Sequence, residues 1–284
     1  MTSGVRVLRA LIREVAKGMG DMDPEHGMAL AVVDKGTSRY YILYAAGHMR
    51  QALAGVEEES RRQAEEDLEG LRAEHKKGRK RGPFPYDDAP AARKKWISAT
   101  TSDYMRLALD AFYEGSREQI EEGNFVIIAM MKVFTGGSSK YPQWDASTVE
   151  LSAAEAGWGP FMYDVVMSAE GGLVPDRSSV SDSARGVWRK YKDSRADVEA
   201  KPLDDPEAPR TKSKRDDTSR FHGDDAPKGK PPENPLNYAY FLESDPADVS
   251  ALISMHKKTE PILRKHGINI SDLASLYFSA KYRS

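Results

Sequence analysis

The stretch that decides the fold reads Thr148-Val-Glu-Leu-Ser-Ala-Ala-Glu155, followed closely by Gly157-Trp-Gly-Pro160. The first eight residues alternate apolar and polar side chains, which is typical of a half-buried strand. The two glycines predict a turn, and residues 161–170 predict a helix with Pro160 in its first turn. A strand that leads through a glycine turn into a helix presents backbone N–H groups, which favours a site for an anion.

Other segments add strands and helices around this unit. Residues 27–34 and 39–44 are rich in Val, Ile and Tyr and flank Asp34-Lys-Gly36, which predicts a β-hairpin. The least polar run, residues 125–133, predicts a central strand that is buried on both faces. Ser181 and Ser183 are candidate N-caps of a helix that reaches Tyr191. Towards the C-terminus the sequence predicts a short strand over 237–242 and helices opened by Asp245-Pro246 and Ser271-Asp272.

A charged helical insertion is predicted at about residues 48–82. Acidic residues come early and basic ones late in this segment, which suits the helix dipole, and the thin apolar stripe predicts a protruding, solvated helix. Two further helices are expected, over residues 91–97 and 103–113, with Ser102 as the N-cap of the second. The fold class is therefore α+β: a mixed sheet flanked by helices.

Composition excludes several kinds of site. The chain has 284 residues, 42 basic and 44 acidic, so no overall charge favours a polyanion partner. The absence of cysteine excludes disulfides, thiolate metal sites and a cysteine nucleophile. The six histidines have no metal-binding spacing, and we predict no metal. No apolar run approaches the roughly 20 residues of a membrane span, and the first residues do not read as a secretory signal.

Three segments are candidates for contacts with partners. An amphipathic helix from Val5 to Lys17 and a proline-rich segment from Lys201 to Pro235, read as a linker or an extended arm, are suited to contacts with other protein subunits. The arm separates a domain over residues 1–200 from a C-terminal extension over 236–284. The basic cluster from Lys76 to Arg81 can contact nucleic acid electrostatically, although such a run is more often a solvated loop.

The run from Leu151 to Asp164, with the segment from Gly172 to Trp188, resembles the acetyltransferase superfamily known as GNAT, and particularly its divergent bacteriophage-encoded members. In that family a bulged strand precedes an Arg/Gln-x-x-Gly-x-Gly/Ala turn, whose backbone amides hold the pyrophosphate of acyl-coenzyme A. The resemblance assigns cofactor binding to Gly157, Trp158 and Gly159. Ala154 stands where the family expects Arg or Gln, a departure that removes a phosphate-facing side chain.

The resemblance also suggests catalytic candidates. The family commonly uses a Tyr as proton donor to the leaving thiolate and a Glu or Asp as base, and the matching positions here are Tyr191 and Glu150. Each also has a structural interpretation, because strand glutamates usually face solvent and late-helix tyrosines usually cover the edge of a core. The absence of cysteine fits direct transfer without an acyl-enzyme.

Two functions follow from this pattern. We favour a non-catalytic GNAT-like protein with a structural or assembly role in a phage virion, found in the host cytoplasm or the virion. The missing phosphate-facing side chain at Ala154 and the extensions suited to partner contacts support it. The alternative is an N-acyltransferase that uses acetyl-coenzyme A at the Gly157–Gly159 turn.

Overall fold

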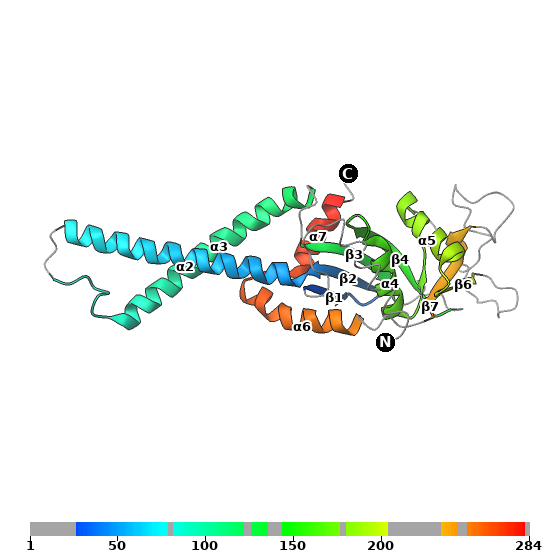
Figure 1. The fold of residues 1–284 in the computed structure, drawn as a ribbon, viewed down its shortest axis with the longest axis horizontal. Coiled ribbons are helices and arrows are strands. Elements are labelled where there is room, and N and C mark those ends of the chain that lie inside the picture. The colour runs from blue at the N-terminus through cyan, green and yellow to red at the C-terminus, as the bar shows by residue number, and fades with distance from the viewer. Residues whose placement is uncertain are drawn as a thin grey trace.

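A computed structural model describes residues 27–78, 82–121, 126–135, 144–176, 180–203, 234–243 and 249–281. The fold is α+β, with one seven-stranded sheet in the order β1-β2-β3-β4-β5-β7-β6. Neighbouring strands are antiparallel except β4 and β5, which run parallel. This part of the chain also forms six α-helices, of which two extend away from the sheet (Figure 1). The predicted fold class is confirmed at this level.

The strands agree largely with the sequence pattern. The predicted hairpin is β1 (Met28–Asp34) and β2 (Ser38–Ala45), and its turn places Gly36 at φ 77°. The predicted central strand is β3 (Ile127–Phe134), and the strand before the glycine turn is β4 (Ser147–Ala154). The short C-terminal strand is β7 (Tyr238–Leu242). These four predictions are confirmed to within two residues at most of their ends.

Two strands were not predicted. β5 (Leu173–Val174) has two residues, and β6 (Val198–Pro202) forms the edge of the sheet beside β7. Lys201 and Pro202 belong to β6, so the predicted arm begins inside a strand, and residues 204–233 of that arm lie outside the described residues. β7 follows the arm in sequence yet lies between β5 and β6. The sheet therefore unites strands from both sides of the predicted linker.

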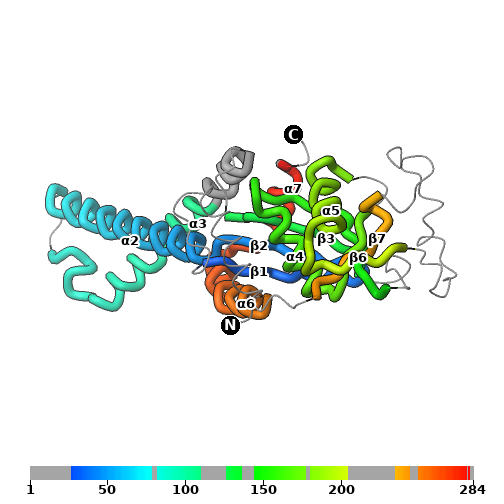
Figure 2. The backbone as a smooth tube through the Cα atoms, turned by 45° about the vertical axis from the view of Figure 1, so that its right-hand side comes forward, coloured from blue at the N-terminus to red at the C-terminus, as the bar shows by residue number. Residues whose placement is uncertain are grey.

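Helices cover both faces of the sheet. One face packs against α4 (Gly159–Glu170) and α5 (Asp182–Ser194), in a core that includes Leu43, Val133 and Trp188. The other face packs against α7 (Ile270–Lys281) and the first turns of α2 (Ala46–Lys77), in a core that includes Ile42 and Tyr277. α6 (Val249–Lys265) lies along the edge strand β1 (Figures 1 and 2).

A pair of long helices projects from the sheet. α2 (Ala46–Lys77) leaves directly from β2, and α3 (Pro90–Glu121) leads back towards β3. Figures 1 and 2 show both helices extending well beyond the strands. The Ala45 N–H donates to the Val126 carbonyl oxygen at 2.8 Å, so the inserted segment starts and ends at neighbouring strands. α2 packs on α3 along a narrow stripe that includes Ala64 and Leu68, in agreement with the predicted protruding helix.

The two helices predicted over 91–97 and 103–113 are one continuous helix, α3. Ser102 is not an N-cap: its hydroxyl donates to the Ser98 carbonyl oxygen at 3.0 Å, four residues earlier within the same helix. The helix predicted over residues 5–17 and the end of the basic cluster, residues 79–81, lie outside the described residues. No helix within the described ranges is long and apolar enough to cross a membrane.

A histidine joins α6 to the sheet and makes stability depend on pH. His256 Nδ1 lies 2.8 Å from the Tyr44 hydroxyl, and His256 Nε2 lies 4.0 Å from Glu260. Burial lowers the pKa of His256 below its ordinary value of 6.5. The unfolded chain therefore binds a proton more readily, so this residue's contribution is complete above about pH 6.5 and is lost as the pH falls below it.

We expect wild-type protein to lose more stability than His256→Gln between pH 7.5 and pH 5. The glutamine carbonyl oxygen can still accept from Tyr44 but does not titrate, and each unit of difference between folded and unfolded pKa is worth about 1.4 kcal/mol. Urea unfolding of both proteins across this pH range measures the difference. Equal pH slopes would contradict this assignment.

Candidate functional site

The predicted strand–turn–helix unit forms as expected. β4 carries a bulge: Leu151 pairs with Lys132 and Val149 pairs with Val133, which leaves Glu150 as the extra residue. Gly157 adopts φ 85°, a left-handed conformation that favours glycine. α4 then starts at Gly159, with Pro160 in its first turn as predicted.

A pocket of about 340 Å³ lies at this turn. Its walls come from the end of β4, the Gly157–Gly159 turn and the first turns of α4 and α5. Ser181 is the N-cap of α5, because its hydroxyl accepts from the Ala184 N–H at 3.3 Å, whereas Ser183 lies inside the helix. The positive ends of two helix dipoles thus meet at one pocket, which favours an anionic or strongly polar ligand group.

The side chains that line this pocket do not add to its attraction for an anion. Among the described lining residues none is Lys or Arg, and the one charged side chain is Glu155, whose Oε1 lies 3.1 Å from Lys281 Nζ. Ala154, at the position where a basic or amide side chain is expected by resemblance, is part of the wall. A pyrophosphate in the pocket would meet backbone N–H groups and hydroxyls without a cationic side chain from the wall.

The three residues assigned to cofactor binding differ in position. Gly157 and Gly159 line the pocket, and a Cβ added to Gly159 would meet no atom within 4 Å. The Trp158 side chain is buried and packs edge-to-face on Phe161, with 5.6 Å between ring centroids. The Trp158 N–H donates to the Glu155 carbonyl oxygen at 3.0 Å and is thereby used within the turn.

Glu150 lies on the opposite side of the sheet from this pocket. Its Oε2 forms an ion pair with Lys132 Nζ at 2.6 Å. Met131 and Val133, on either side of Lys132, belong to the core under α4 and α5, so Lys132 points to the α7 face. Lys132 also lines a separate pocket beside α7, with its ammonium group near the rings of Tyr40 and Phe134.

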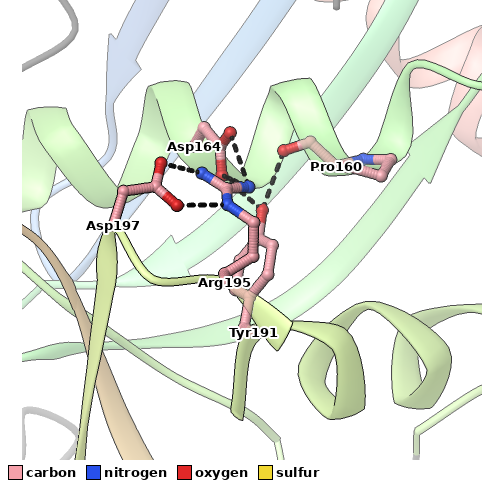
Figure 3. A network of polar contacts seen from close by, with 5 residues as sticks. All are labelled: Pro160, Asp164, Tyr191, Arg195 and Asp197. Carbon is pink, nitrogen blue, oxygen red and sulfur yellow. Dashed lines mark hydrogen bonds and ion pairs between the residues drawn. The ribbon is translucent and has the colours of Figure 1, made fainter. Parts of the chain in front are cut away.

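Tyr191 belongs to a buried polar network beside the pocket rather than to its wall (Figure 3). Its hydroxyl lies 2.9 Å from the Pro160 carbonyl oxygen and 2.5 Å from Asp164 Oδ1. Arg195 Nη1 lies 3.2 Å from Asp164 Oδ2, and Arg195 also forms two contacts of 2.6 Å with Asp197. Burial, reinforced by the Asp164 carboxylate, raises the pKa of Tyr191 well above its ordinary value.

The structure brings a different pair of hydroxyls to the pocket. Ser152 Oγ on β4 lies 2.9 Å from the Tyr163 hydroxyl on α4, and both residues line the wall. Sequence reasoning missed this pair. Their positions in the sequence could have indicated it. Ser152 is two residues before Ala154 and so on the same face of β4, and Tyr163 is one helical turn after Gly159.

The described residues contain no group of three or more His, Asp or Glu side chains that could hold a metal ion. Comparison with protein-family models, curated proteins and solved structures gives no match to this chain.

Proposed function

We propose that this protein is a non-catalytic structural or assembly protein built on a GNAT-like fold. A bulged strand, a glycine turn with one positive φ and a helix that begins at Gly159 support the resemblance on which the fold assignment rests. The resemblance to phage-encoded members implies a virion as the assembly.

The observation that carries the proposal is the separation of the candidate catalytic groups from the pocket. Acyl transfer requires a base and an acid within reach of the reacting atoms. Glu150 is paired with Lys132 beyond the sheet, and the Tyr191 hydroxyl is fully buried against Asp164 and Pro160. A pocket without these groups, and whose described wall residues include no Lys or Arg, suits a retained scaffold better than an active transferase.

The projecting helices support the assembly part of the proposal. α2 and α3 have 32 residues each, and they share a narrow apolar stripe while most of α2 faces solvent. The packing of α2 on α3 buries only a small part of the surface of the two helices, so it does not explain why they are so long. Contact with other subunits would explain their length.

The N-acyltransferase is the second candidate function, and the pocket itself favours it. Two helix N-termini converge on a space of about 340 Å³, and the Ser152–Tyr163 hydroxyl pair can donate hydrogen bonds into it. In this case coenzyme A would bind through backbone N–H groups and hydroxyls.

Isothermal titration with acetyl-coenzyme A and with coenzyme A separates the two functions. We expect no binding to the wild-type protein at millimolar ligand. The comparison variant is Gly159→Trp, which fills the pocket from a position where a side chain meets nothing within 4 Å. The matched control is Gly55→Trp, at an exposed and equally open glycine on α2.

Micromolar binding that is lost in Gly159→Trp and kept in Gly55→Trp would contradict the proposal and establish the pocket as a cofactor site.

A further inference from the structure

A groove of about 820 Å³ lies where the projecting helices meet the turn between α6 and α7. α2 forms one wall, α3 forms the opposite wall, and Lys265, His266 and Gly267 close one end. The groove is separate from the glycine-turn pocket and shares no lining residue with it.

The apolar part of the groove is a single row along α3. Ile97, Met105 and Leu109 line it at intervals of eight and four residues, which places them on one helix face. Met105 is buried, whereas Ile97 and Leu109 are partly exposed. A bound segment would therefore find a narrow apolar strip rather than a deep cavity.

The rim of the groove is predominantly basic. Among the described residues, five basic side chains line it, against the two carboxylates of Glu57 and Glu65: Arg61, Arg93, Lys94, Arg106 and Lys265. In the described part of the chain Arg61 and Lys94 form no ion pair within 4.0 Å. The ion pairs of the other three are long, at 3.5 Å for Arg93–Glu69, 3.9 Å for Arg106–Asp103 and 3.8 Å for Lys265–Glu57. This excess contrasts with the net charge of −2 of the whole chain.

We propose that this groove binds an amphipathic helix of a partner protein, one whose apolar stripe is flanked by Asp and Glu. The inference deepens the proposed assembly role and rests on it for the existence of a partner. Two packed helices leave a groove that a third helix fills, with apolar anchors one turn apart along the strip. The acidic flanks would meet Arg61 on α2 and Lys94 and Arg106 on α3.

The same features argue against nucleic acid as the occupant. A phosphate backbone has no apolar stripe to lay on Ile97 and Leu109. Glu57 and Glu65 flank Arg61 at four-residue spacing along α2, so the α3 wall, with Arg93, Lys94 and Arg106, carries most of the basic charge of the groove.

The test uses three helix-stapled peptides of about 18 residues, or five turns. They share one leucine stripe and differ in their flanking positions, which are all Glu, all Gln or all Lys. Fluorescence anisotropy measures their binding to the full chain and to the double variant Lys94→Glu/Arg106→Glu. Both sites are exposed. The control is Arg189→Glu/Lys190→Glu, which makes the same charge change at exposed positions on α5.

We expect the Glu-flanked peptide to bind the wild-type protein and the control, and to lose about tenfold or more in affinity for the groove variant, as two lost charge pairs imply. The Lys-flanked peptide should show the reverse preference and gain affinity for the groove variant. The Gly159→Trp variant should bind the Glu-flanked peptide as the wild type does, so this result is independent of coenzyme binding.

Three results would overturn the inference: no binding of the Glu-flanked peptide, an equal loss in the α5 control, or equal binding of all three peptides. Tight binding of a single-stranded oligonucleotide that the groove variant abolishes would also overturn it, by assigning the groove to nucleic acid.

Discussion

Replacing Glu170 by alanine should lower the free energy of unfolding by about 3 to 5 kcal/mol. Glu170 ends α4, and its side chain is 5% exposed. Its Oε1 lies 2.8 Å from Arg39 Nη1 and also accepts from the Tyr41 hydroxyl, and its Oε2 accepts from Ser147 Oγ at 2.8 Å. Alanine would leave two buried hydroxyls without their acceptor and would detach the end of α4 from β2 and β4.

Urea unfolding measures this loss. Glu170→Gln should cost clearly less than Glu170→Ala, because the amide oxygen can still accept from a hydroxyl although the ion pair with Arg39 is lost. Asp182→Ala is the control, since that side chain is fully exposed and should change stability by no more than about 0.5 kcal/mol. A Glu170→Ala protein as stable as the control would show that these contacts do not hold α4 in place.

Arg195→Met is the second substitution with a large expected effect, about 3 to 5 kcal/mol at pH 7. Asp164 is 6% exposed, and Arg195 is its cationic partner in the network of Figure 3. Methionine preserves much of the packing volume but leaves a buried carboxylate with the Tyr191 hydroxyl as its remaining partner in this network. Asp197 is about half exposed and can be solvated after the change.

The loss caused by Arg195→Met should shrink at acid pH. Burial already raises the pKa of Asp164, and Arg195 opposes that rise. Without Arg195 the folded-state pKa rises further, so the folded protein holds the proton more tightly than the unfolded chain. Stability is then highest below the unfolded value of about 3.9 and is lost as the pH rises through the folded-state value.

The measurement is urea unfolding at about pH 4 and pH 7 for the wild type, Arg195→Met and an exposed control on α5, Arg189→Met. The control should have the same free energy of unfolding as the wild type at both pH values. A penalty for Arg195→Met that does not change with pH would contradict the account of Asp164.

The elements that were predictable from the sequence are those marked by a local apolar run or by a turn residue. β3 is apolar except at Lys132, the β1–β2 hairpin has Gly36 at its turn, and Pro160 marks the start of α4. β5 and β6 lack such a pattern: β5 has two residues, and β6 carries Glu199, Lys201 and Pro202, the composition of an edge strand or a linker. Their strand character depends on pairing with distant residues of β4 and β7.

The candidate site was predictable in location but not in its side chains. The glycine turn and the pocket beside it follow from the local sequence. The direction of Glu150 does not, because a bulge adds one residue to β4 and interrupts its two-residue alternation. The Tyr191 hydroxyl is held by Asp164 and Pro160 of another helix, and the spacing of these residues in the sequence does not predict the contacts.

The length of α2 and α3 determines how far the projection reaches from the sheet. A helix of 32 residues is about 48 Å long at 1.5 Å per residue. The inserted segment enters and leaves where the Ala45 N–H donates to the Val126 carbonyl oxygen, beside the paired strands β2 and β3. A tilt of about 10° at this base displaces the far end by about 8 Å over that length. A small change of angle where the helices leave β2 and β3 would therefore move the tip by several ångströms and change which surfaces it can meet.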